Sequence, residues 1–332
     1  IREMANETSL TLSYAPLLTT TLMKVLDSGA LNDQVFEADV FLQWLRASGR
    51  LKVIDGGERI RVGLLHEKNS TAGWYADYEA LDTTAQNGMT AAFYNWKQGS
   101  VSISVHGREL RSNKGASRIT SLQQEKIQQA AMSLADVVAT GAFSDGSGTG
   151  SKQLTGLAAM NETSPGTTAY ASVSTANTAW VNQVQASVGS AATNLLPSLR
   201  TLHNDCKQGK GGAAGSPDFG VTTQVVHEAL EALIFPQVRY QANPKGGADM
   251  GVEKLMFKGI PIEWDDYCTS GELHLLNSNN MMLFVHSDAN FKMADGGFQK
   301  PINQDALLTQ IFFQGNLATN NRRKNGKLAG VS

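Results

Sequence analysis

The sequence is poor in cysteine and has no long apolar run. Its only two cysteines, Cys206 and Cys268, lie far apart with no Cys-x-x-Cys spacing, which excludes a disulfide framework and the usual zinc sites and favours a reducing compartment. Apolar stretches such as Met281–Val285 are far shorter than the roughly 18 residues of a membrane helix. The N-terminus has no secretory pattern, and Met4–Ala5 has the form of a native start. We therefore expect a soluble protein without a membrane partner, made in a cytoplasm.

An excess of charge of either sign is also missing. Lys and Arg number 28 and Asp and Glu 30, for a net charge of −2. This balance disfavours histone-like or repressor-like proteins, which need a field that attracts phosphates. Charged residues make up only 17% of the chain, against roughly 25% in ordinary soluble domains. The low value indicates surface covered by copies of the same chain, or alternatively an ordinary glycine-rich enzyme.

The first 57 residues predict an arm with two helices. Residues 6–13 are β-leaning, with too little apolar surface to fold alone. A first helix is expected to begin at Pro16, with Leu18, Leu22, Val25 and Leu26 on one face. A second is expected over 36–45, capped by Asn32 or Asp33.

A long two-stranded segment is predicted next, over 58–112. Asp55-Gly56-Gly57 supplies a tight turn between the apolar runs 51–54 and 59–65. Apolar residues alternate with others in 59–65 and again in 101–106, as in half-buried strands. The segment is either a sheet at the edge of a core or a projecting ribbon that needs a neighbour to pack on. Six aromatic residues lie between the runs: Trp74, Tyr75, Tyr78, Phe93, Tyr94 and Trp96.

The remaining chain mixes helices and strands, which predicts an α+β fold. Helical spacing is clearest over 117–141. A second compact region is expected from about Trp180, with helices near 195–208 and 222–235. Short strands follow over 255–264, 273–276 and 281–286, and an apolar cluster lies within 303–329.

Patterns of known enzyme sites are not met. His227-Glu228 would need a second His at position 231 to bind zinc, and that residue is Glu. The glycines of 146–150 lack phosphate-loop spacing, and Cys206 and His203 lack a third group to orient them. Asp265 and Asp266 are neighbours on a strand and should point to opposite faces. No catalytic residue, cofactor or metal ligand is predicted.

One dense basic cluster stands near the C-terminus, formed by Arg322, Arg323, Lys324 and Lys327. Such a run is usually a solvated or subunit-contacting face. It could alternatively bind DNA weakly and without sequence preference.

Four stretches, in this order, resemble the major capsid proteins of tailed bacteriophages with the Hong Kong 97 fold. They are Thr178–Val184 (TAWVNQV), Phe235–Tyr240 (FPQVRY), Phe257–Ile262 (FKGIPI) and Leu317–Arg323 (LATNNRR). The resemblance implies an N-terminal arm over 1–57, an extended loop over 58–112 and a peripheral domain with a spine helix over 113–180. It further implies an axial domain over 181–285 and a return to the peripheral domain over 286–332.

The resemblance also implies the function and the partners. The chain would form pentamers and hexamers of an icosahedral virion shell around double-stranded DNA, assembled in a host bacterial cytoplasm. The six aromatics would contact neighbouring subunits. With about 50 residues before the loop, a separate scaffolding protein is expected, together with a portal and possibly a decoration protein. Some members of the family cross-link a lysine of this loop to an asparagine of a neighbour; Lys97 lies in the loop, but the sequence identifies no partner for it, so no cross-link is predicted.

Two alternatives remain open at this stage. An encapsulin-like compartment would share the fold and enclose a cargo protein. A soluble hydrolase would use Cys206 or His227 as nucleophile or base.

Overall fold

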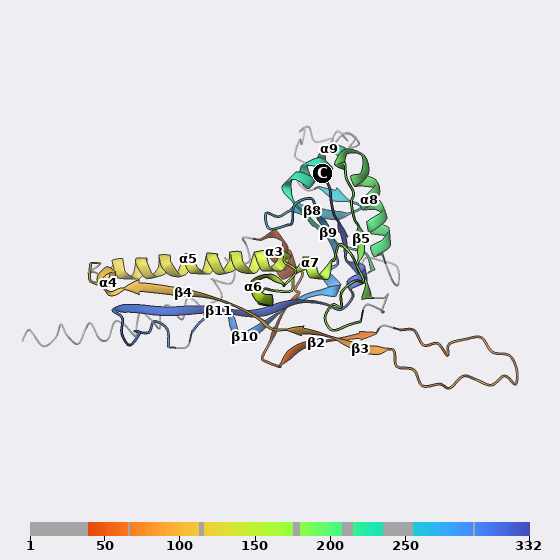
Figure 1. Cartoon of the computed structure of the whole chain (residues 1–332), viewed down its shortest axis with the longest axis horizontal. Coiled ribbons are helices and arrows are strands. Elements are labelled where there is room, and N and C mark those ends of the chain that lie inside the picture. Colours follow the sequence, from red (N-terminus) through yellow and green to blue (C-terminus); the bar gives the residue numbers. More distant parts are fainter. Residues whose placement is uncertain are drawn as a thin grey trace, which may run out of the picture.

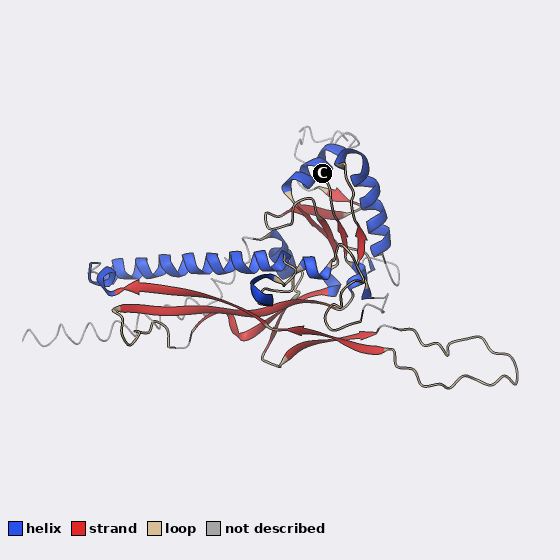
Figure 2. Ribbon diagram, in the orientation of Figure 1, coloured by secondary structure: helices blue, strands red, loops and turns tan. Residues whose placement is uncertain are grey.

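The computed structural model describes residues 39–65, 67–112, 116–174, 180–207, 215–234, 255–294 and 296–332. Within them the chain is a mixed α+β protein with three β-sheets, which confirms the predicted class (Figures 1 and 2). One sheet lies along a long helix, a second stands with two helices near one end of that helix, and a two-stranded ribbon runs outward. The predictions for 6–13 and for the helix that starts at Pro16, and the whole stretch 235–240, lie outside the described residues.

The first sheet has four strands from distant parts of the chain. Its order is β1 (Leu51–Ile54), β10 (Met281–Met293), β11 (Ala306–Thr319) and β4 (Lys97–His106). β1 runs parallel to β10, and the other two pairs are antiparallel. The apolar cluster predicted within 303–329 therefore forms a strand at the centre of this sheet.

The long helix α5 (Ala116–Phe143) packs on β4 and β11. It confirms the clearest prediction from the sequence, because residues at helical spacing on one side are buried and face the sheet. Gly99 of β4 lies beneath Leu134, whose Cδ1 would be 3.4 Å from an added Cβ. The buried residues of this face include Ile127, Ala131, Leu134, Val138 and Phe143.

We expect Leu134→Ala to destabilise the subunit by about 2–5 kcal/mol, the range for removing a buried leucine side chain and leaving a cavity. Leu134 is fully buried in the core under α5. Met132→Ala is the matched control, since Met132 is exposed on the same helix and surface changes usually stay within about 0.5 kcal/mol. Urea unfolding of both variants measures the difference. Equal midpoints would show that α5 is not packed as described.

The second sheet has six strands and its own core. Its order is β5 (Gln183–Gln185), β12 (Gly326–Leu328), β9 (Leu273–Leu276), β6 (Phe219–Thr222), β8 (Ile260–Trp264) and β7 (Met256–Phe257). Helices α8 (Ala191–Cys206) and α9 (Gln224–Ile234) pack beside it and agree with the two helices predicted here. The core contains Leu195, Leu199, Leu202, Leu230 and Leu273.

Helix α3 (Val40–Ala47) lies where the two sheets meet. Trp44 stacks on Phe219 of the second sheet, with 4.6 Å between ring centroids, and Phe41 packs on Phe143 of α5 at 5.5 Å. Asp39 caps the helix by accepting a hydrogen bond from the Leu42 N–H at 2.9 Å. The predicted cap at Asn32 or Asp33 is therefore wrong, because the helix begins later than its apolar pattern indicated.

The predicted hairpin around Asp55-Gly56-Gly57 is also wrong. The two flanking strands belong to different sheets, since β1 pairs with β10 and β2 (Arg59–Leu65) pairs with β3 (Met89–Asn95). Gly56 and Gly57 have φ values of 157° and 115°. They carry the chain from the sheet to the ribbon, and residues 55–57 join two strands of different sheets instead of closing a hairpin.

The chain passes between the two sheets more often than the predicted segments allow. β10 crosses the expected boundary at residue 285, and β12 leaves the final segment to pair with β9 and β5 in the second sheet.

Short helices complete the described chain: α4 (Gly107–Ser112), α6 (Gly148–Ser151), α7 (Leu157–Met160), and the 3₁₀ turns η4 (Ser278–Asn280) and η5 (Arg322–Lys324).

Candidate assembly surface

The ribbon consists of β2 and β3, paired from Arg59↔Asn95 to Leu65↔Met89. Its side chains alternate between two faces, as a strand requires. Ile60, Leu64 and Tyr94 are buried against the body of the subunit. At the far end Leu65 and Met89 are exposed, so the ribbon leaves its own core at that point.

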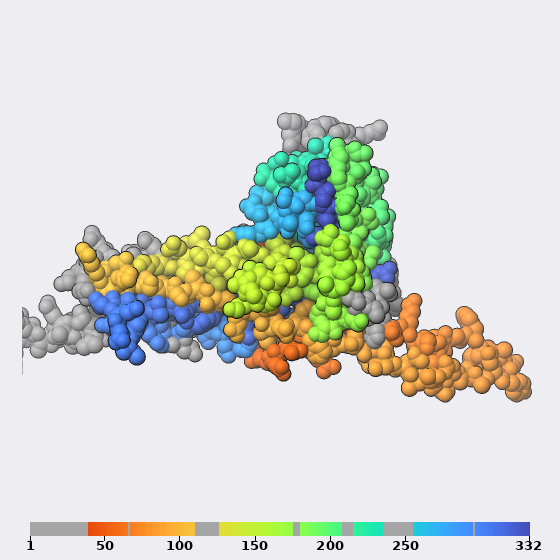
Figure 3. Space-filling view, viewed as in Figure 1, coloured from red at the N-terminus to blue at the C-terminus, as the bar shows by residue number. Residues whose placement is uncertain are grey.

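Beyond β2 and β3, the described residues 67–88 form a loop without regular secondary structure. Figures 1 and 3 show it extending away from the body. Local side-chain hydrogen bonds shape it: Asn69 Oδ1 accepts from the Thr71 N–H at 2.9 Å, and Asp82 Oδ1 accepts from the Thr84 N–H at 2.9 Å. The hydroxyl and amide of Thr84 lower the pKa of Asp82. We call residues 67–88 the ribbon tip.

The ribbon tip exposes large apolar side chains that this subunit does not cover. Trp74 and Tyr78 are fully exposed, and Tyr75 and Leu81 are mostly exposed. The tip also carries four acidic residues and one lysine. Exposed aromatic clusters of this kind are typical of surfaces that bind another protein.

The other three predicted contact residues lie at the base of the ribbon. Tyr94 is 3% exposed, and its hydroxyl donates a hydrogen bond to the Thr319 carbonyl at 2.8 Å. Its prediction as a subunit contact is corrected, because β11 of the same chain covers the ring. Trp96 is half-buried and donates from Nε1 to the Gly57 carbonyl at 2.8 Å, and Phe93 remains 38% exposed.

The observed ribbon is shorter than the predicted segment 58–112. Its second half, β4, pairs with β11 along its whole length and belongs to the first sheet. Lys97 therefore begins a core strand, and its Nζ donates to the Ser151 carbonyl. With Lys152, Asp136 and Phe313 it lines a cavity of about 280 Å³ beside α5.

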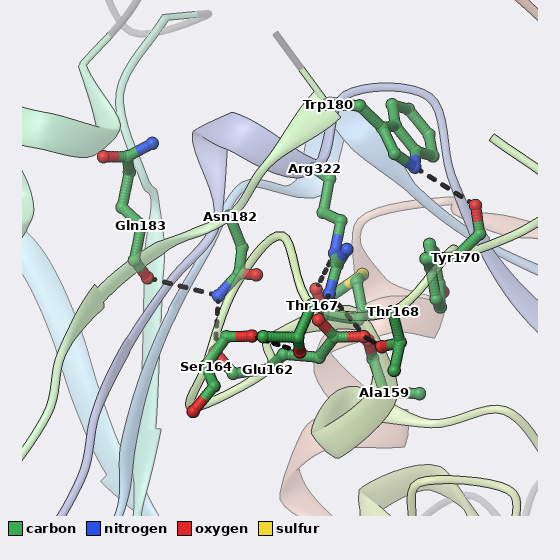
Figure 4. A network of polar contacts seen from close by, with 11 residues as sticks. Ala159, Glu162, Ser164, Thr167, Thr168, Tyr170, Trp180, Asn182, Gln183 and Arg322 are labelled. Carbon is green, nitrogen blue, oxygen red and sulfur yellow. Dashed lines mark hydrogen bonds and ion pairs between the residues drawn. The ribbon is translucent and has the colours of Figure 1, made fainter. Parts of the chain in front are cut away.

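Arg322 of the basic cluster is buried inside the subunit and is only 2% exposed. Its Nη2 lies 3.4 Å from Glu162 Oε2 and donates to the Ala159 carbonyl at 3.0 Å, while Nε donates to the Met160 carbonyl (Figure 4). The guanidinium also stacks on Tyr170, 4.6 Å from the ring centroid. The expectation that Arg322 faces solvent, DNA or a neighbour is corrected, since it holds the segment 159–170 to the end of β11.

Lys327 is also buried, in the second sheet. Its Nζ lies 2.7 Å from Glu272 Oε1, and His274 Nε2 lies 3.4 Å from Glu272 Oε2. Burial lowers the pKa of His274, so its ring is neutral beside the Lys327–Glu272 pair. The basic cluster is thus not one surface patch, because only Arg323 and Lys324 keep partial exposure.

Sequence reasoning missed the acidic partners of these cations. Glu162 and Glu272 are isolated carboxylates in the sequence, 160 and 55 residues from Arg322 and Lys327. The sequence did hold one signal, since Lys327 is followed directly by Leu328 and Ala329, which is unusual for a solvated tail.

The candidate nucleophile Cys206 is fully buried in the second core. Burial raises its pKa strongly, which keeps the thiol protonated and unreactive. The nearby His203 instead packs its ring edge on Phe257. Among the described residues there is no cluster of His, Cys, Asp or Glu that could hold a metal ion, and no helix there is long and apolar enough to cross a membrane.

No protein-family model matches the sequence, and no curated protein matches it. Solved structures match the fold over most of the chain. The capsid asymmetric unit of cyanophage A-1(L) matches with a TM-score of 0.63 at 14% identity, covering 86% of this chain and 93% of that one. The satellite phage P4 procapsid, which includes a size determination protein, matches with a TM-score of 0.54 at 11% identity over 99% and 98%.

A third match is a protein compartment. The encapsulin complex SrpI from Synechococcus elongatus PCC 7942 has a TM-score of 0.52 at 13% identity, over 87% of this chain and 88% of that one. The three matches cover most of this chain and of each matched chain, and the resemblance noted in the sequence is confirmed at the level of the fold. The chain therefore has the fold of the subunits that build phage capsids and encapsulin shells.

Proposed function

We propose that this protein is the major capsid protein of a tailed bacteriophage, with a structural and not a catalytic role. The full-length match to capsid subunits carries the proposal. The exposed ribbon tip supports it, because a two-stranded ribbon is only marginally stable in water and needs a surface to lie on. In a shell that surface would belong to the neighbouring subunit.

Trp74, Tyr75 and Tyr78 would be the main contact residues of the ribbon tip. Each is exposed here, and aromatic side chains dominate the energy of many protein interfaces. Phe93 and Trp96 would add contact at the ribbon base, where part of each ring is still accessible. Head-to-tail contacts of this kind close into rings, as pentamers and hexamers require.

The remaining parts take the roles that the capsid fold implies. Residues 1–57 would be the N-terminal arm, α5 the spine helix of the peripheral domain, and the six-stranded sheet with α8 and α9 the axial domain. The shell would enclose double-stranded DNA in a virion assembled in the bacterial cytoplasm, with scaffolding, portal and decoration proteins as partners. Arg323 and Lys324 remain candidates for weak contact with DNA or a neighbour.

An encapsulin-like compartment is the second candidate, favoured by the match to the cyanobacterial shell. Its subunit would assemble in the same way and enclose a protein. Neighbouring genes distinguish the two, since terminase and portal genes accompany a phage capsid and a peroxidase or ferritin-like gene accompanies a compartment.

Negative-stain electron microscopy and sedimentation of the purified full-length protein test the shared proposal. We expect closed shells or capsomer rings when the chain is expressed with its neighbouring genes. A compact monomer under every expression condition would refute an assembly role.

A further inference from the structure

Two carboxyl groups meet in the interior at the junction of the two sheets. Asp39 caps α3 and Asp265 directly follows β8, and they are 2% and 4% exposed. Both carboxyls bond to the first turn of α3, since Asp265 accepts from the Phe41 N–H and Asp39 from the Leu42 N–H, which places the two side chains next to each other. Two buried carboxylates in contact repel each other strongly unless one of them is protonated.

The hydrogen bonds around the pair indicate which carboxyl holds the proton. Both oxygens of Asp265 already accept backbone N–H groups, Oδ1 from Tyr267 at 2.9 Å and Oδ2 from Phe41 at 3.3 Å. Asp39 Oδ1 accepts from Leu42, but its buried Oδ2 has no donor. A proton on Asp39 Oδ2 would satisfy that atom by donating to the Asp265 carboxylate.

The other titratable groups near the pair add no positive charge. Tyr267 lies beside both carboxyls and donates its hydroxyl to Asp136 of α5, and Cys268 lies on the other side of Asp265. In the described part of the chain, the groups that act on Asp39 are the Asp265 carboxylate and the N–H groups of Leu42 and Phe41. The described groups that touch the pair are therefore neutral or acidic, and none is a cation.

We propose that Asp39 and Asp265 share one proton, and that its loss as the pH rises towards neutral weakens the hold on α3 at the junction of the two sheets. The shared proton links α3 to the loop after β8, and we call this contact the joint. Helix α3 in turn contacts Phe219 and Phe143 on either side. Deprotonation would place two adjacent buried negative charges at this joint. The joint would then open more often, and α3 would lose its contacts with the second sheet and with α5.

The direction of the pH effect follows from the proton balance. Burial, and then the charge of Asp265, raise the pKa of Asp39 from 3.8 to about 7. Between the pKa of 3.8 in the open joint and about 7 in the closed joint, only the closed joint holds the proton. The stability of the closed joint therefore falls as the pH rises through this range, and it changes little above pH 7. From pH 5.5 to 8.5 the population with α3 released should increase about 30-fold.

Asp39→Asn tests the proposal on the full-length chain. The amide keeps the capping oxygen for Leu42, and its NH₂ donates to Asp265 at every pH. Hydrogen exchange of the peptide covering residues 40–48, corrected for intrinsic amide rates, reports the release of α3. We expect the 30-fold rise in wild type and a flat profile in Asp39→Asn.

Asp136→Asn is the matched control, because Asp136 is an exposed acid in the same network. It should keep the wild-type profile.

Infrared difference spectra provide a second readout. Wild type at pH 5.5 should show the C=O stretch of a protonated carboxyl. This band should disappear near pH 7 and be missing in Asp39→Asn. Asp39→Ser, which also caps a helix, serves if the Asn variant does not fold. A missing band in wild type, or a pH-dependent rise that persists in Asp39→Asn, would overturn the proposal.

Discussion

Replacing residues 66–88 by Asn-Gly should give a folded subunit that no longer forms shells. The last ribbon pair, Leu65↔Met89, would then be closed by a two-residue turn of the type that hairpins prefer. The buried ribbon residues Ile60 and Tyr94 stay in place, so thermal unfolding should change little. Sedimentation and electron microscopy measure the loss of shells.

A full-length variant separates the aromatic contacts from the length of the loop. Trp74→Ser, Tyr75→Ser and Tyr78→Ser together keep the ribbon tip but remove its large side chains. Buried aromatic anchors typically contribute about 2 kcal/mol or more each, so the triple variant should weaken each subunit contact by at least about 4 kcal/mol, or roughly a thousandfold. Normal shells from both the shortened and the triple variant would exclude the ribbon tip as an assembly contact.

Arg322→Met should destabilise the subunit by about 3–5 kcal/mol. Methionine approximates the length of the arginine stem but leaves the Glu162 carboxylate without its cation, and an uncompensated buried charge has this effect. It also removes the hydrogen bonds to Ala159 and Met160 in the network of Figure 4. Urea unfolding of the variant measures the change.

The double variant Glu162→Gln/Arg322→Met identifies the cause. Neutralising Glu162 removes the unpaired charge, so the double variant should be more stable than Arg322→Met alone. If the two are equally stable, the loss comes from the backbone hydrogen bonds and the packing on Tyr170, and not from the ion pair.

The elements that the sequence predicted well are those decided by local periodicity. α5 repeats apolar residues at helical spacing for seven turns or so, and no competing pattern interrupts it. The strands of β2 and β11 were likewise visible as alternation or as an apolar cluster. The start of α3 was missed because Phe36 fits the helical spacing of the apolar residues that follow it. That fit placed the predicted cap before Phe36, at Asn32 or Asp33, whereas the cap is Asp39.

Pairing and burial could not be predicted, because they depend on residues far away in the chain. The glycines at 56 and 57 indicated a break between strands, but nothing local shows that β1 joins β10. Tyr75 and Tyr94 look alike in the sequence, yet one is exposed and the other bonds to Thr319. Arg322 looked like a surface cation since its partner Glu162 stands alone in a polar stretch.

The long-range pairing in the first sheet also governs when the subunit can fold on the ribosome. β1 needs β10, and β4 needs β11, which ends only at Thr319. At about 5–20 residues per second, the first strand emerges roughly 10 to 50 seconds before its sheet can close. During that interval the nascent chain presents unpaired strand edges and the apolar face of α5. The core of each copy can therefore form only after the ribosome has passed Thr319.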